Sequence, residues 1–160
     1  MISGIFPPDS GGPAKFAAEF SEWASQHGHK VRVISYVDTR PLIVNQNAVR
    51  ISRNENVIIR YFKMIRTIIN STQRGFRIFA VGAFLETYIA SILKRFDYVV
   101  KVPGDIVWER ARNNKVTDLD IIDFQSALLP FKYRIFRNMF SRSLKRASLV
   151  IVPSKSLFQL

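Results

Sequence analysis

Residues 1–26 read MISGIFPPDSGGPAKFAAEFSEWASQ, and this stretch decides the fold class. Met1–Phe6 is a short apolar run that two prolines stop, which predicts a buried strand. The triplet Gly-Gly-Pro at 11–13 then precedes apolar residues at helical spacing up to Gln26, and proline suits the first position of a helix. A strand, a glycine-rich turn and a helix in this order form the first unit of a parallel α/β sheet.

The rest of the chain repeats this alternation. Further strands are expected at 31–37, 48–52, 76–81, 98–102 and 149–152. Further helices are expected at 56–71 and 84–95, from 106 onward, and at 121–146 with an interruption at Pro130. Strands separated by helices need right-handed crossovers and a parallel sheet covered on both faces. The sequence therefore predicts one Rossmann-like, three-layer α/β domain over residues 1–160.

Composition excludes several kinds of chemistry. The chain has no cysteine, which excludes disulfides, thiolate metal ligands and a cysteine nucleophile. The two histidines, His27 and His29, flank a glycine, and their spacing does not suggest a metal site. The longest apolar run, 78–85, is far shorter than the roughly 20 residues that span a bilayer, and the first residues do not resemble a signal peptide. We therefore expect a cytoplasmic protein without a bound metal.

The charge is strongly and unevenly positive. Twenty-four basic residues against 12 acids give a net charge of +12, with no acid between Glu55 and Glu86 and none after Asp123. Such a charge favours a polyanionic partner, which could be nucleic acid, a phosphorylated substrate or an anionic membrane surface.

The loop after the first strand contains the adjacent glycines Gly11 and Gly12. In open parallel sheets ligands bind beyond the carboxyl ends of the strands. Residues without a Cβ let backbone amides approach a ligand closely, and the helix N-terminus behind them favours phosphate. The motif is neither a dinucleotide fingerprint nor a P-loop. A phosphate-binding loop and a simple tight turn both stay open at this point.

A second loop, 101–110, follows the strand at 98–102 and contains Asp105, Trp108 and Glu109. Asp105 could bond or deprotonate a hydroxyl, or it could cap the helix that begins at Ile106, and the cap is the favoured interpretation. Trp108 suits the core or a stacking platform for a sugar better than a catalytic role.

Four segments together resemble the N-terminal domain of family 4 glycosyltransferases. They are GIFPPDSGGPA at 4–14, GHKV at 28–31, KVPGD at 101–105 followed by WE at 108–109, and VPS at 152–154. They occur in the family's order and span nearly the whole chain. The resemblance implies the acceptor-side half of a GT-B enzyme, one that retains anomeric configuration and needs no bound metal or other cofactor.

The resemblance also implies roles for individual residues. Gly11 and Gly12 would lie against the diphosphate of the nucleotide-sugar donor and near the acceptor. Acceptor-binding residues would be Lys101, Gly104, Trp108 and Glu109, and Asp105 would be the catalytic candidate. Many family members carry a histidine where this chain has Gly104 and Asp105. His29 matches a structural turn and is not a candidate base.

In this family a second Rossmann-like domain holds most of the donor. The chain stops shortly after the segment at 152–154, so we expect a fragment without that domain and without measurable transfer activity. The implied function is transfer of a sugar from a nucleotide sugar to a glycan or lipid-linked acceptor in cell-surface polysaccharide or lipopolysaccharide synthesis.

Two helices combine an apolar face with basic residues. In the helix at 56–71 the apolar arc includes Ile58 and Phe62, and Arg60, Lys63 and Arg66 lie opposite. The helical part of 132–146 adds a second basic cluster: Arg134, Arg137, Arg142, Lys145 and Arg146. Core packing is the favoured explanation of the apolar residues. The excess charge leads us to expect peripheral association with the inner face of the cell membrane, through Arg60, Lys63 and Arg66.

Two alternatives stay open. A non-catalytic basic module would bind nucleic acid or an anionic membrane, although the sequence contains no RNP motif, zinc-finger spacing or evident helix-turn-helix to support nucleic acid. A one-domain subunit would be completed by a separate donor-binding chain.

Overall fold

A computed structural model describes residues 1–38, 48–73 and 75–158 of the chain. Within this part the strands form one six-stranded sheet in the order β3-β2-β1-β4-β5-β6, and every neighbouring pair is parallel. The strands are β1 Ile2–Ser3, β2 Val33–Val37, β3 Ala48–Ser52, β4 Ile78–Ala80, β5 Tyr98–Lys101 and β6 Leu149–Ile151. The predicted parallel α/β fold is confirmed.

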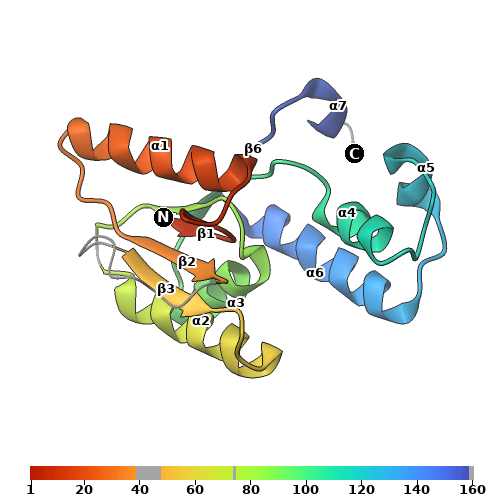
Figure 1. Ribbon diagram of the computed structural model, residues 1–160, viewed down its shortest axis with the longest axis horizontal. Coiled ribbons are helices and arrows are strands. Elements are labelled where there is room, and N and C mark those ends of the chain that lie inside the picture. The colour runs from red at the N-terminus through yellow and green to blue at the C-terminus, as the bar shows by residue number, and fades with distance from the viewer. Residues whose placement is uncertain (39–47, 74, 159–160) are drawn as a thin grey trace.

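Helices occupy the crossovers between strands. They are α1 Gly12–Gln26, α2 Val57–Ser71, α3 Phe84–Lys94, α4 Ile106–Asn113, α5 Ile121–Ser126, α6 Phe131–Arg146 and α7 Lys155–Phe158. Figure 1 shows α1 on one side of the sheet and α2 and α3 on the other, and α6 packs beside α3. This arrangement gives the three layers of a Rossmann-like domain.

Successive side chains along each strand point to opposite faces of the sheet, so neighbouring residues contact different layers of helices. Phe79 on β4 packs against the rings of Phe16 and Phe20 of α1, whereas its neighbour Ala80 faces the opposite layer. On that opposite face, the hydroxyl of Tyr98 donates a 2.6 Å hydrogen bond to the backbone oxygen of Ser143 in α6. The main core lies on this side, between the sheet and the layer formed by α2, α3 and α6.

The ends of several elements follow from local chemistry. Asn56 caps α2, because its side-chain oxygen accepts a hydrogen bond from the backbone N–H of Ile58. Gly28 follows α1 with φ of 81°, a left-handed conformation that favours glycine at the end of a helix. The expected helix over 121–146 is interrupted before Pro130, giving separate helices α5 and α6. The strand expected at 1–6 is much shorter, with β1 ending at Ser3.

The expected burial of the apolar arc of α2 is wrong for its first half. Met64 and Ile68 are buried, but Ile58 is 78% exposed and Phe62 is 64% exposed. At about 100° per residue, Ile58 lies roughly a quarter to a third of a turn from the Met64–Ile68 stripe, and Phe62 lies roughly a third to nearly half a turn from it. The sheet and α3 cover this stripe and the partly buried Ile65 and Ile69, and Ile58 and Phe62 remain on the surface.

Candidate functional site

The order of the strands reverses between β1 and β4, since β1 continues to β2 on one side and β4 to β5 on the other. Such a switch point is where parallel sheets leave a crevice for a ligand. Two glycines meet there: a Cβ atom on Gly82 would lie 2.3 Å from the backbone nitrogen of Gly4 and 2.7 Å from its Cα. Ala83, the next residue, has a left-handed backbone with φ of 48°. Strained backbone of this kind is frequent at ligand sites.

A cavity of about 360 Å³ lies at this point, beyond the carboxyl ends of β1, β2 and β4. Its lining combines aromatic rings, guanidinium groups and carboxyl groups. The side chains that carry this chemistry are Tyr36, Arg53, Arg60, Tyr61, Glu86, Glu109, Arg110, Asn113 and Phe136. They come from helices α2, α3, α4 and α6 and from the ends of β2 and β3. The sheet order therefore gathers residues that lie far apart in the chain.

A buried hydrogen-bonded pair forms one wall of this cavity. The hydroxyl of Tyr36 donates a hydrogen bond of 2.6 Å to Oε1 of Glu86, and both residues are less than a tenth exposed. Burial raises the pKa of Glu86 above its usual range, while the Tyr36 hydrogen bond and the charges of Arg110 and Arg60 oppose that rise. Burial, followed by the charge of Glu86, raises the pKa of Tyr36. The pair can present a carboxyl group to a ligand hydroxyl inside the fold.

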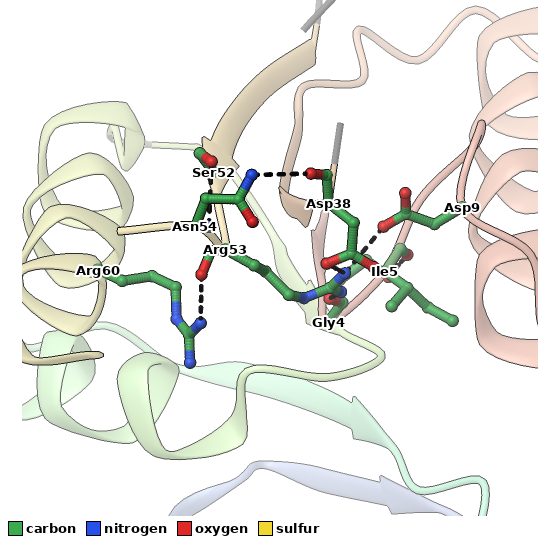
Figure 2. Close-up of polar contacts among 9 residues, drawn as sticks. Gly4, Ile5, Asp9, Asp38, Ser52, Arg53, Asn54 and Arg60 are labelled. Carbon is green, nitrogen blue, oxygen red and sulfur yellow. Dashed lines mark hydrogen bonds and ion pairs between the residues drawn. The ribbon is translucent and has the colours of Figure 1, made fainter. Parts of the chain in front are cut away.

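Arg53 joins three segments around the cavity (Figure 2). Its Nη1 lies 3.0 Å from Oδ2 of Asp9 and 2.7 Å from Oδ1 of Asp38, and its Nη2 donates to the backbone oxygen of Gly4. Arg60 in turn donates a 3.0 Å hydrogen bond to the backbone oxygen of Arg53. These contacts hold the end of β3 and the start of α2 against the loop between β1 and α1.

Arg60 is the cation whose contacts point most clearly into the cavity. Its guanidinium lies 5.3 Å from the centroid of the Tyr36 ring, within the range of a cation–π interaction. Its Nε atom is buried without a hydrogen-bond partner among the described residues. A buried donor without a partner is costly, and a ligand oxygen in the cavity could supply the missing acceptor.

The predicted phosphate-binding turn, Gly11 and Gly12, is exposed, and it does not line the cavity, although the next residue, Pro13, does. Gly11 has φ of 142°, and a Cβ atom there would lie 3.0 Å from Cδ1 of Ile5, a residue that lines the cavity. Gly11 is the N-cap of α1. Because glycine has no side chain, the backbone N–H groups at the start of α1 have no side-chain cap from this residue. The geometry suits an approaching anion, and it also suits a tight turn; the phosphate role stays a prediction.

Asp105 is the N-cap of α4. Its Oδ1 accepts hydrogen bonds from the backbone N–H groups of Val107 at 2.9 Å and Trp108 at 3.0 Å, and its Oδ2 accepts one of 2.8 Å from Nε2 of Gln125. Both carboxylate oxygens are thus occupied within the protein. The favoured interpretation of Asp105 as a helix cap is confirmed. A catalytic role for Asp105 stays a prediction.

The structure brings two of the four predicted acceptor-binding residues together and separates the others: the carboxyl group of Glu109 lies against Gly104, where an added Cβ would collide with Oε1. Glu109 lines the 360 Å³ cavity, and partial burial together with the charge of Asp105 raises the pKa of its carboxyl group. Gly104 lines a different cavity of about 470 Å³ near α4 and α6. Lys101 lies over the Phe16 ring, 4.1 Å from its centroid, and Trp108 donates through Nε1 to the backbone oxygen of Leu119 at 3.0 Å.

The three basic residues predicted to contact a membrane also separate. Arg60 lines the cavity, and Lys63 forms an ion pair of 2.6 Å with Glu55. Arg66 is exposed on α2. In the part of the chain that the structure describes, no helix is long and apolar enough to cross a bilayer, and no group of three or more histidine and acidic side chains is placed to hold a metal ion.

Sequence reasoning missed most side chains of the cavity lining, among them Tyr36, Arg53, Glu86 and Arg110. One signal was available for Glu86, because it is the only acid between Glu55 and Asp97 and interrupts an apolar helix. Tyr36 and Arg53 carry no comparable signal. Their place follows from the strand order β3-β2-β1-β4, which brings the ends of β2 and β3 beside the switch point.

In comparisons with known proteins, no family model matches the sequence, and no curated protein matches it significantly.

Proposed function

We propose that this chain is the acceptor-side domain of a GT-B glycosyltransferase that transfers a sugar from a nucleotide sugar to a glycan or lipid-linked acceptor. The observation that carries the proposal is the cavity at the switch point, whose lining includes Pro13, the residue that follows the exposed Gly11–Gly12 turn. The ordered resemblance of four sequence segments to family 4 glycosyltransferases supports the same class. Synthesis of cell-surface polysaccharide or lipopolysaccharide is the process that this resemblance suggests.

The lining of the cavity suits a sugar. The rings of Tyr36, Tyr61 and Phe136 offer apolar faces, and arginine and glutamate side chains offer donors and acceptors for hydroxyl groups. The charges are nearly balanced, because Arg53 is paired with two aspartates while Arg60 and Arg110 share the cavity with Glu86 and Glu109. Balanced charge favours an acceptor group rich in hydroxyls and without a net charge of its own.

Roles follow for particular residues. Glu86 and Glu109 would accept hydrogen bonds from acceptor hydroxyls, and Arg60 and Arg110 would donate to ring or hydroxyl oxygens. Gly11 and Gly12 would face the donor diphosphate through backbone amides. Retention of configuration and independence from metal are properties that the resemblance implies for the complete two-domain enzyme.

Two-dimensional NMR of the ¹⁵N-labelled chain tests the site. Neutral mono- and disaccharides should shift the amide signals of Gly4, Gly82 and Tyr36, and UDP or GDP should shift those of Gly11 and Gly12. In the variant Arg110→Ala we expect the affinity for the best saccharide to fall by about tenfold or more, as expected when a hydrogen bond from a charged group is lost. Arg112→Ala is the matched control, because Arg112 lies on the same helix over the Trp108 ring, away from the cavity lining.

Saccharide-induced shifts confined to the other cavity, or none at all, would contradict the proposed site. Glycosyltransferase activity is measured independently of ligand binding, by assaying the transfer of a radiolabelled sugar from a nucleotide sugar to an acceptor. Because the resemblance assigns donor binding to a second domain, we expect no transfer by the 160-residue chain alone, and robust turnover would overturn that part of the proposal.

A further inference from the structure

The surface that begins at the α5–α6 loop exposes large apolar side chains. Leu128 in this loop is fully exposed, and Phe131, the first residue of α6, is 74% exposed. Ile135 follows one helical turn later and is 43% exposed. Large apolar side chains that gather on one surface commonly mark an interaction site.

The same face of α6 is basic along the rest of its length. Phe131, Ile135 and Arg142 follow one another at the spacing of a single helical stripe. Five exposed cations lie beside or on this stripe: Lys132, Arg134, Arg142, Lys145 and Arg146. None of the five forms an ion pair among the described residues, and the sequence contains no acid after Asp123. We call Leu128, Phe131, Ile135 and these five cations the α6 surface.

Helix α2 is the weaker candidate for the same role. It also exposes apolar side chains at Ile58 and Phe62, but Arg60 turns into the cavity and Lys63 is paired with Glu55. Only Arg66 of its three basic residues is left without such a contact among the described residues. The combination of apolar and unpaired basic side chains is therefore concentrated on α6.

We propose that the α6 surface docks on a bilayer that contains anionic lipid. Basic side chains are attracted to the lipid headgroups, and apolar side chains at one end of the helix enter the boundary between headgroups and acyl chains. Nucleic acid would neutralise the same cations, but it would leave Leu128 and Phe131 in water because its contacts with basic helices are mainly with phosphates. The inference does not depend on the proposed transferase activity.

Vesicle co-sedimentation tests the proposal with the full 160-residue chain. We expect binding to vesicles of phosphatidylcholine with about 30% phosphatidylglycerol, weaker binding in high salt, and little binding to pure phosphatidylcholine. The variants Leu128→Ser/Phe131→Ser and Arg142→Glu/Arg146→Glu should each lose at least about tenfold in affinity. Ile58→Ser/Phe62→Ser on α2 is the matched control, and we expect its affinity to stay within about twofold of the unmodified chain.

A second measurement reports the depth of the contact. In Phe131→Trp, fluorescence of the new tryptophan should shift to the blue and be quenched by brominated lipid, beyond any change of Trp23 and Trp108 in the unmodified chain. Undiminished binding by the two α6 variants, or an unquenched tryptophan at position 131, overturns the proposal. It is also overturned if the Leu128→Ser/Phe131→Ser variant abolishes self-association in light scattering or binding to duplex nucleic acid while vesicle binding is unchanged.

Discussion

The hydroxyl of Tyr36, near the end of β2, donates a 2.6 Å hydrogen bond to Oε1 of Glu86 in α3, 50 positions further along the chain. The bond crosses from the sheet to the covering helix at the wall of the cavity. Because burial raises the pKa of Glu86, the folded protein binds this proton more tightly than the unfolded chain does. The contribution of Glu86 to stability is therefore most favourable below the ordinary glutamate pKa, and it declines as the pH rises toward the raised value.

We expect Glu86→Gln to be more stable than the unmodified protein at pH 8, by about 1 to 3 kcal/mol, because glutamine avoids burying a charge and still accepts the Tyr36 hydrogen bond. At pH 4, where the glutamate is protonated, this advantage should disappear. Urea unfolding across this pH range measures the difference. Glu19→Gln is the control, since Glu19 is an exposed residue paired with Lys15 on α1. A stability difference that does not change with pH would contradict the burial argument.

Gly82→Ala should destabilise the protein by about 3 kcal/mol or more, because the added Cβ would meet the backbone of Gly4, which has no flexible side chain to move away. Gly12→Ala is the contrasting substitution. Nothing lies within 4 Å of a Cβ at Gly12, which begins α1, so we expect its stability to be unchanged or slightly higher. Thermal unfolding followed by circular dichroism compares the two. A similar loss of stability in both variants would show that the Gly4–Gly82 contact is not what makes Gly82→Ala destabilising.

Asp105→Ala should cost about 1 to 2 kcal/mol, because α4 loses its N-cap and Gln125 loses one of its two acceptors, keeping only the backbone oxygen of Ile121. Asp105→Asn keeps an oxygen for the cap and should cost much less. Chemical denaturation of the two variants gives the values. If asparagine destabilises as much as alanine, the negative charge matters more than the cap geometry.

Arg53→Lys should cost about 1 to 3 kcal/mol, because an ammonium group cannot reach Asp9, Asp38 and the Gly4 oxygen together. Hydrogen exchange should locate the change: the amide of Asp9, which donates to the backbone oxygen of Phe6 at 3.1 Å, should exchange faster. Arg66→Lys on the exposed face of α2 is the control and should alter neither quantity. Unchanged exchange at Asp9 in Arg53→Lys would show that the arginine does not hold this loop.

The fold could be predicted because each strand is a short apolar run beside proline, glycine or a helix cap, and those signals are local. The strand at 48–52 appears where the sequence places it, and the helix expected at 56–71 begins at Val57, with Asn56 as its cap. The membership of the cavity could not be predicted in the same way. Periodicity places Arg60 on a solvent-facing arc of α2, yet the neighbouring Tyr36 ring and the Arg53 carbonyl bring it into the cavity. Periodicity defines the faces of a helix, but the neighbours that cover each face are set by the order of the strands.

Gly4 and Gly82 line the cavity, and the contact between them involves backbone atoms alone. Substitutions in the surrounding rim, at Tyr61, Glu109 or Arg110, can then change which molecule is recognised without disturbing the two strands that meet underneath. The backbone contact between Gly4 and Gly82 thus supports the fold, while the side chains of the rim determine which ligand is bound. A scaffold of this kind can accommodate many ligands through changes in its outer side chains.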